Sequence, residues 1–375
     1  MRINIAASHR FHLLDLAREL SNHGHEVRFY SYVPTKRASK FGLKKECSYS
    51  LFYLLFPLLA LMKLTKGSNW SVRIIHNALD LYLSYFMRPC DVFIGLGTVY
   101  KSSFIAAKKR FEAITILEWG SKHNEEQHRI LSEIPGLKQQ LKYFKERTLD
   151  GYNLADYIAI PSAHVRQSFI DRGFSENKLV VNPYGVDLEM FSPTSLKKDD
   201  CFDVIMVGGW SYVKGCDLLT DYFRNSNLTF LHVGPIVNLA FPREKNMVHI
   251  DAVDQSRLID YYSRASIFVL PSRAEGLAMV QLQALACGLT IVCSKHTGGS
   301  DLKELLHDKR WIIEMDEFTI PELTKCINSA LELSKKQVGV RSYAKDMIDL
   351  LTWQAYGNRY NKNLECLLYA SVKSK

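Results

Sequence analysis

The sequence lacks the patterns of a protein that depends on bound metal, disulfides or secretion. Its eight cysteines lie far apart and form no C-x-x-C pair, which argues against a zinc site or disulfide framework and favours a reducing compartment. The N-terminal stretch MRINIAASHRFH has no apolar signal-peptide core and predicts a first β-strand instead. An Asp-x-Asp motif is also absent, so we expect no divalent metal and no resident cofactor.

No apolar run in the sequence is long enough to cross a bilayer, which needs ~20 residues. The longest informative run is YSLFYLLFPLLALM (49–62), which Pro57 interrupts. Lysines flank this run on both sides, at Lys40, Lys44, Lys45, Lys63 and Lys66. Two interpretations stay open: an ordinary core helix with solvated flanks, or a surface that dips into the cytoplasmic leaflet of a membrane.

Positive charge is concentrated in the first half of the chain. Residues 1–190 contain 26 Lys and Arg against 18 Asp and Glu, a net charge of 26 − 18 = +8, whereas residues 191–375 contain 22 against 21, a net of +1. This asymmetry predicts an anionic partner for the first half. We expect a cytoplasmic protein, peripheral on the inner face of the cell membrane, with a glycan or lipid-linked acceptor; no nucleic-acid-binding motif is recognisable.

The length of 375 residues predicts about two domains. Short segments rich in β-branched residues and ended by Gly, Pro or Ser alternate with helical segments, which is typical of parallel α/β sheets. The predicted strands are 3–7, 26–32, 91–97, 114–117, 156–162, 203–209, 228–235, 247–253, 266–272 and 289–294. They indicate two doubly wound α/β domains in tandem, with a ligand in the crevice at the carboxyl ends of the strands.

Pro183, Gly185 and Pro193 break regular structure in the stretch NPYGVDLEMFSP (182–193). We therefore predict the domain boundary there. We expect a first domain over 1–185 and a second over 186–355, with a C-terminal helix of about 356–375 that returns to the first domain. The stretch GLGTVY (95–100) resembles a dinucleotide fingerprint, but Tyr100 stands at the third glycine position and would obstruct the close helix packing. NAD binding is therefore disfavoured.

The stretch PSRAEGLAMVQLQALACG (271–288) places an acid, Glu275, at the start of a nearly all-apolar segment. A helix that starts near Leu277 would leave its first backbone amides unbonded, and such a terminus attracts a diphosphate. The amides expected to face the crevice are those of Gly276, Leu277, Ala278 and Met279. Gly276 has no side chain to obstruct the ligand.

Four segments of the second half resemble the retaining GT-B glycosyltransferases of family 4. They are NPYGVDLEMFSP, VGGWSYVKGCDLL (207–219), HVGP with YYSRASIFVLPSRAEG (261–276), and EGLAMVQLQALACGLTIVCSKHTGG (275–299); RELSNHGHEV (18–27) adds a weaker likeness in the first half. The resemblance implies a GT-B fold, in which two Rossmann-like domains face each other across a cleft. It also implies a nucleotide diphosphate sugar, of UDP or GDP type, as donor.

The resemblance assigns roles to individual residues. Glu275 corresponds to the acid placed at the donor hexose, and Gln283 stands where the family has a second acid at the ribose. Gly209 replaces the family's usual arginine, which leaves Lys214 as the matching cation at the diphosphate. Further donor contacts are expected from Gly208, Gly234 and Arg273. Four other residues could contact the donor or could equally belong to ordinary turns and core: His232, Thr297, Gly298 and Gly299.

In the first half, the family often carries a pocket histidine after the strand that corresponds to 114–117. Here Glu118 occupies that place, with His123 five residues later, and both are catalytic candidates. The glycine pair that the family carries after the first strand is absent; Ser8, Arg10 and His12 stand there instead. No phosphate loop is therefore expected at that position.

The function implied is a retaining transfer of a hexose-type sugar, in surface polysaccharide or lipopolysaccharide synthesis. The leaving diphosphate itself would take the acceptor proton, so no protein nucleophile is required. Two alternatives stay open: a non-catalytic glycosyltransferase-like binding subunit, and another GT-B enzyme such as a nucleotide-sugar epimerase or a phosphorylase.

Overall fold

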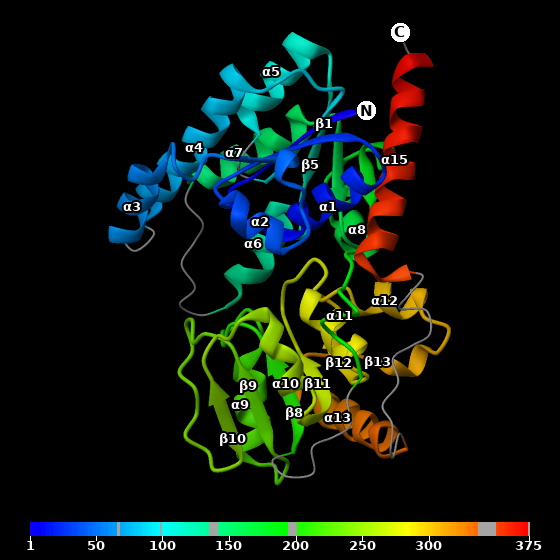
Figure 1. Ribbon diagram of the computed structural model, residues 1–375. Coiled ribbons are helices and arrows are strands. Elements are labelled where there is room, and N and C mark those ends of the chain that lie inside the picture. The colour runs from blue at the N-terminus through cyan, green and yellow to red at the C-terminus, as the bar shows by residue number, and fades with distance from the viewer. Residues whose placement is uncertain (66–67, 98–99, 135–141, 194–200, 337–349, 374–375) are drawn as a thin grey trace.

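The computed structural model describes residues 1–65, 68–97, 100–134, 142–193, 201–336 and 350–373, and they form two domains, one above the other in Figure 1. Each domain has a parallel β-sheet with helices around it. The predicted fold class, α/β with two Rossmann-like doubly wound domains, is confirmed.

The N-terminal sheet has, within the described residues, seven parallel strands in the order β3-β2-β1-β4-β5-β6-β7. Its strands are buried along most of their length because helices cover them, as expected for parallel sheets. They are β1 (Arg2–Ala7), β2 (Glu26–Ser31), β3 (Ser48–Ser50), β4 (Val92–Leu96), β5 (Ile114–Glu118), β6 (Tyr157–Ile160) and β7 (Leu179–Val181). The helices of this domain are α1 (Phe11–Asn22), α2 (Thr35–Lys40), α3 (Phe56–Leu64), α4 (Asn69–Phe86), α5 (Lys101–Phe111), α6 (Asn124–Ser132), α7 (Lys142–Leu154) and α8 (Ala163–Ile170).

The C-terminal sheet has, in the part of the chain that the structure describes, six parallel strands in the order β10-β9-β8-β11-β12-β13. They are β8 (Phe202–Val207), β9 (Phe230–Val233), β10 (Met247–Ile250), β11 (Ala265–Leu270), β12 (Thr290–Ser294) and β13 (Ile312–Met315). The helices are α9 (Cys216–Arg224), α10 (Leu258–Tyr262), α11 (Met279–Ala286), α12 (Gly299–Leu305) and α13 (Ile320–Lys335). In both sheets the chain reverses its direction of strand addition beside the first strand, which is where such folds bind ligands.

Three observed strands were not predicted from the sequence: β3, β7 and β13. Each is only three or four residues long and lies at an edge of its sheet. A segment this short carries too little alternation or β-branched content to stand out from a loop. The predicted strands all fall on observed ones, with ends that differ by at most about three residues.

The last helix, α15 (Trp353–Lys373), lies beside the N-terminal domain (Figure 1). It packs on α1, where a side chain at Gly357 would meet Glu19 Cβ at 2.4 Å. His23 Nε2 lies 2.9 Å from Asn358 Oδ1, and the Asn182 side chain donates to the Tyr356 carbonyl at 3.2 Å. The end of the chain is therefore bound to the domain that holds its beginning.

Candidate active site

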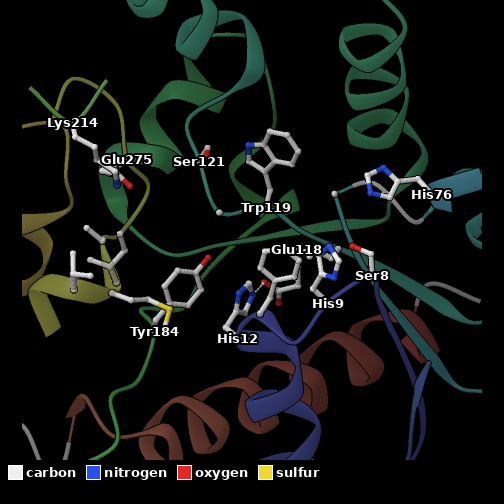
Figure 2. A pocket seen from close by; sticks show the side chains of 18 residues that line it. Ser8, His9, His12, His76, Glu118, Trp119, Ser121, Tyr184, Lys214 and Glu275 are labelled. Atoms are coloured by element: carbon white, nitrogen blue, oxygen red, sulfur yellow. Dashed lines mark hydrogen bonds and ion pairs between the residues drawn. The ribbon is translucent and has the colours of Figure 1, made fainter. Parts of the chain in front are cut away.

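A cavity of about 540 Å³ lies between the two domains (Figure 2). Its N-terminal wall includes residues that follow β1, β4 and β5, and its C-terminal wall includes residues that follow β8 and β11. All of these positions are at or just beyond carboxyl ends of parallel strands, the edge at which doubly wound sheets bind ligands. The cavity is thus in the predicted crevice.

Glu275 and Lys214 meet at the C-terminal wall, at one end of the group drawn in Figure 2. The Lys214 ammonium forms an ion pair with Glu275 Oε1, which also accepts a hydrogen bond from Ser272 Oγ at 3.0 Å. The Glu275 backbone is fixed as well, because its N–H donates to the His296 carbonyl at 2.8 Å. Both side chains are mostly buried, so this charge pair is partly shielded from water.

The backbone after Glu275 offers unbonded N–H groups to the cavity. Helix α11 begins at Met279, two residues later than predicted, and Ala278 is its N-cap. Within the described residues, the N–H groups of Gly276, Leu277 and Met279 have no hydrogen-bond acceptor. The fourth predicted amide, Ala278, was expected wrongly to be free: its N–H donates to the Thr297 carbonyl at 3.2 Å. Three amides therefore remain for a ligand beside the lysine.

Gly276 is also a point at which the two domains come very close on this wall. A side chain there would place its Cβ only 1.9 Å from the Gly120 carbonyl oxygen of the N-terminal domain. Ser162 Oγ donates to the Gly276 carbonyl at 2.9 Å, and His164 Nε2 lies 3.1 Å from the Glu275 carbonyl. The glycine is thus needed for the domains to approach, in addition to any contact with a ligand.

The glycines after β8 and β9 form a close backbone contact. Gly208 and Gly234 have φ angles of +133° and +150°, and a side chain at Gly234 would meet the Gly208 carbonyl oxygen at 2.1 Å. The ring of His232 lies beside them, with Nε2 2.8 Å from that same carbonyl. Burial lowers the pKa of His232 to about 4, so the neutral ring donates this hydrogen bond. At Gly209, a Cβ would meet Val237 Cγ2 at 2.9 Å.

Six predicted donor contacts are not among the described residues that line the cavity: Gly208, Gly209, Gly234, Gly276, Arg273 and Gln283. Arg273 points to the other side of its loop, where it binds both oxygens of Asp217 at 2.7 Å and lies over the ring of Phe318. It therefore does not replace the cation lost at Gly209. Gln283 is buried inside α11, where its Oε1 accepts a hydrogen bond from Tyr262 at 3.2 Å, and it is not among the described residues of the cavity wall.

Glu118 lines the cavity but both of its carboxylate oxygens are occupied. Oε2 lies 3.0 Å from His12 Nε2, and Oε1 accepts a hydrogen bond from Tyr360 at 2.7 Å. The His12 ring in turn packs on Tyr184, with ring centroids 4.5 Å apart. Because these partners come from α1, β5 and α15, Glu118 joins the first sheet to the returning C-terminal helix at the cavity wall.

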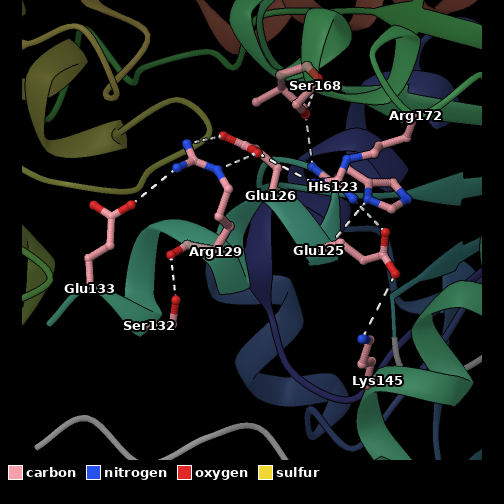
Figure 3. Close-up of polar contacts among 10 residues, drawn as sticks. His123, Glu125, Glu126, Arg129, Ser132, Glu133, Lys145, Ser168 and Arg172 are labelled. Atoms are coloured by element: carbon pink, nitrogen blue, oxygen red, sulfur yellow. Dashed lines mark hydrogen bonds and ion pairs between the residues drawn. The ribbon is translucent and has the colours of Figure 1, made fainter.

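His123 lies outside the cavity, and its predicted catalytic role is dropped (Figure 3). Its ring is the N-cap of α6, because Nδ1 accepts a hydrogen bond from Glu125 N–H at 3.3 Å. The ring is only 3% exposed and packs among Tyr152, Phe169 and Phe174. The sequence marked His123 only by its place after the predicted strand 114–117, and in the structure the helix uses this histidine as a cap.

The burial of His123 predicts a pH dependence of stability. Burial lowers its pKa to about 4, against about 6.5 in an unfolded chain, so between these values the unfolded state binds one more proton. Stability should therefore fall with decreasing pH by up to about 1.4 kcal/mol per pH unit from this group alone. His123→Asn keeps a capping acceptor and should make the fall shallower by that amount, as measured by urea unfolding at about pH 4.5–6.5. An unchanged slope would contradict the assignment.

Several cavity residues were not predicted, because no motif marks them. His76 comes from the middle of α4, and Trp119 and Ser121 follow β5. Burial, with a contribution from Arg147, lowers the pKa of His76 to about 4, so this ring faces the cavity uncharged at neutral pH. In the described ranges no group of three His, Cys, Asp or Glu side chains is placed to bind a metal ion, and a metal-free site stays a prediction.

Two Rossmann-like domains that face each other across a ligand-sized cavity define the GT-B architecture of glycosyltransferases. Residues 189–347, most of the C-terminal domain, match the family model "Glycosyl transferases group 1". The chain is 25% identical over 236 residues to a subunit of the phosphatidylinositol N-acetylglucosaminyltransferase of Arabidopsis thaliana; the match covers 57% of this chain and 52% of that protein. It is 27% identical over 170 residues to the sulfoquinovosyl transferase SQD2 of the same plant, covering 40% of this chain and 33% of that protein.

The chain thus spans about half or less of the length of these curated relatives. Solved structures match nearly all of it. Alr3699/HepE of Anabaena, in complex with UDP and glucose, has a TM-score of 0.64 at 14% identity and covers 97% of this chain and 99% of its own. Sucrose-phosphate synthase of Thermosynechococcus elongatus has a TM-score of 0.65 at 14% identity, covering 99% and 100%. At this identity, the structural likeness establishes the GT-B fold.

Proposed function

We propose that this protein is a retaining glycosyltransferase that moves a hexose-type sugar from a nucleoside diphosphate donor to a glycan or lipid-linked acceptor. The observation that carries the proposal is the C-terminal cavity wall, where Lys214, Glu275 and the unbonded amides of Leu277 and Met279 lie together, with the unbonded amide of Gly276 next to them in the chain. One cation and a row of N–H groups suit a diphosphate, and the adjacent carboxylate suits the hydroxyls of a sugar. The match of this domain to group 1 glycosyltransferases supports the same assignment.

The donor would lie along the carboxyl edge of the second sheet. Its diphosphate would sit on the amides of Gly276, Leu277 and Met279, with its hexose at Glu275. Of the described residues that line the cavity, Lys214 is the only lysine or arginine, so it is the cation that meets charge developing on the leaving group. The nucleoside would extend toward Gly208 and Gly234, the glycines that follow β8 and β9. UDP is the favoured nucleotide, since Alr3699/HepE was solved with it.

Retention of configuration is supported by the state of the two cavity carboxylates. Glu275 is paired with Lys214, and Glu118 is bound by His12 and Tyr360. Both oxygens of Glu118 and Oε1 of Glu275 are thus bound, which disfavours either carboxylate as a nucleophile. The acceptor proton is then best taken by the leaving diphosphate on the same face of the sugar, and the protein contributes positioning and charge stabilisation.

The acceptor would enter from the N-terminal wall. Ser8, His9, His76 and Ser121 offer hydrogen-bonding groups there, and Trp119 offers a flat ring face of the kind that sugars pack against. A role in surface polysaccharide or lipopolysaccharide synthesis is the setting we propose. One related sequence, 23% identical over 171 residues, is described as an uncharacterized protein in the cps region of Klebsiella pneumoniae.

Binding of a nucleoside diphosphate tests the donor half of this proposal. UDP at about 100 times its dissociation constant should stabilise the protein by about 2.7 kcal/mol, seen as a rise of several degrees in thermal-shift measurements. GDP and ADP are screened in parallel, and NAD is the negative control. A shift with NAD and none with any nucleoside diphosphate would favour an oxidoreductase.

Product analysis separates transfer from the two alternatives. A transferase forms a new glycoside only when an acceptor is present and releases the nucleoside diphosphate. An epimerase changes the sugar without an acceptor, and a protein that only binds leaves the donor intact. Slow donor hydrolysis by the purified protein, lost in Glu275→Ala, would exclude the non-catalytic alternative.

A further inference from the structure

Helix α3 is apolar around most of its circumference, yet none of its residues is buried. Its inner side chains, Leu58, Leu59 and Met62, pack partly on the core of the N-terminal domain. Its outer side chains, which include Phe56 and Leu64, face solvent, and Leu64 is 81% exposed. A surface helix normally carries polar residues on its outer side. The outer side of α3 therefore has the composition of a face that is covered in the working protein.

The exposed apolar side chains continue on both sides of α3. Tyr53 and Leu54 precede it, with 81% and 61% exposure, and Trp70 and Ile74 follow it on the first turns of α4. We call the set the α3–α4 face; its members are Tyr53, Leu54, Phe56, Leu61, Leu64, Trp70 and Ile74. In Figure 1, α3 and the start of α4 lie at the outer side of the N-terminal domain, opposite α15. Several large exposed apolar side chains on two elements that pack against each other are typical of an interaction site.

The segment of chain that carries this face is rich in positive charge. Between Cys47 and Cys90 the sequence contains four basic residues, Lys63, Lys66, Arg73 and Arg88, and one acid, Asp80. Asp80 is buried and bound by Ser103 and Arg147, so it does not offset the surface charge. Lys63 and Arg73 are exposed beside the apolar side chains. Exposed apolar side chains on a segment whose exposed charges are cations suit a partner that is apolar inside and anionic at its surface.

We propose that the α3–α4 face docks on an anionic lipid bilayer, with α3 lying in the plane of the interface. A second copy of the chain fits less well, because a symmetric contact would bring Lys63 and Arg73 of both copies together, and this segment carries no exposed acid to pair with them. Crossing the bilayer is not implied: α3 has nine residues, about 13 Å of helix, against ~30 Å of hydrocarbon. Among the described residues, no helix is both long and apolar enough to span it.

Docking in this way would place the cavity close to the lipid surface. Helix α4 begins at the docking face with Trp70 and Ile74 and contributes His76 to the cavity wall. Phe11, which is half exposed, stands at the same wall. Resting on the proposed function, the inference names the acceptor class: a sugar or polyol head group held at a membrane by its lipid, reaching the cavity past α4.

Vesicle flotation with purified full-length protein tests the docking directly. The protein should float with vesicles of phosphatidylcholine and phosphatidylglycerol in a ratio of about 7:3, bind pure phosphatidylcholine at least severalfold more weakly, and lose affinity at high salt. The double variant Leu54→Glu/Leu64→Glu should bind the anionic vesicles at least about tenfold more weakly, because both side chains would have to be desolvated as charges. Lys63→Glu should weaken binding about fivefold.

A matched control is available on the opposite side of the domain. Tyr369→Glu introduces the same charge at a residue that is 64% exposed on α15, and it should leave vesicle binding unchanged. Equal binding by the double variant and the parent would overturn the proposal. So would a dimer in lipid-free solution that the double variant dissociates, since the face would then be occupied by a second copy.

The outcome can be separated from that of the proposed function. Donor binding and donor hydrolysis in solution, without vesicles, should be the same in the double variant and the parent. Loss of vesicle binding with intact donor hydrolysis supports the docking face. Vesicle binding by a protein that binds no nucleoside diphosphate would retain the docking proposal and overturn the enzymatic one.

Discussion

Replacing Lys214 with alanine is expected to lower kcat/KM for sugar transfer about 100- to 1,000-fold, the range seen when one charge-stabilising group is removed from an active site. The reason is that Lys214 is the only lysine or arginine among the described residues of the cavity wall. Negative charge grows on the leaving diphosphate in the transition state, and in the variant only backbone amides would meet it. Steady-state kinetics with the donor identified by thermal shift measure the effect.

The substitution should act mainly on kcat, since the charge grows in the transition state. Lys214→Arg should recover part of the loss, because it restores the charge with a different geometry. The control is Lys295→Ala, which removes an exposed lysine from a nearby loop and should change kcat/KM less than about twofold. If Lys214→Ala kept a third or more of the parent activity, the phosphates would have to bind elsewhere.

Gly276→Ala is expected to reduce activity at least about 100-fold while leaving both domains folded. The added Cβ would lie 1.9 Å from the Gly120 carbonyl oxygen, closer than any contact that atoms allow, so the domains must separate on this wall. Separation would also break the hydrogen bond from Ser162 to the Gly276 carbonyl. Displacement of the reacting groups by about 1 Å is enough for a loss of this size. Transfer kinetics and the radius of gyration in solution scattering, which should rise, are the measurements.

Gly24→Ala is the matched control for this prediction. Gly24 has a φ of +82° and open space around its missing side chain, so the substitution costs backbone strain without moving a domain. It should lower the melting temperature slightly and keep full activity. Normal activity of Gly276→Ala with an unchanged radius of gyration would show that the domain contact is not required.

Much of the fold was readable because parallel strands buried on both faces have a distinctive composition. Segments such as 203–209 and 266–272 are short, β-branched and ended by Gly or Pro, and both coincide with central strands. Edge strands such as β13 (Ile312–Met315) were missed because half of this strand is only partly buried and its sequence, IIEM, has no clear period. Strands can thus be predicted from the sequence where they are buried on both faces, and less well at the edges of a sheet.

The cavity was predicted mainly on its C-terminal wall; on the other wall the sequence singled out Glu118. Glu275 and Lys214 are 61 residues apart, yet each follows a strand of one sheet, so strand order predicts that they come near each other. His76 reaches the other wall from a helix, and Tyr184 reaches it from the interdomain segment. Neither residue was predicted as part of the site from the sequence. His123 was predicted to be catalytic because a histidine that caps a helix inside an aromatic cluster has the same sequence context as a histidine in an open polar loop.

Local patterns were sufficient to predict two parallel α/β domains and a cavity wall after β11, because hydrophobic periodicity and glycine placement act over short stretches of chain. Which side chains are free to act, by contrast, became clear only from the packing of the folded chain. Arg273 is held by Asp217, Glu118 by His12 and Tyr360, and the outer side of α3 is left uncovered. Partners of this kind come from distant parts of the chain, and the long-range packing that brings them together is not encoded in any local pattern.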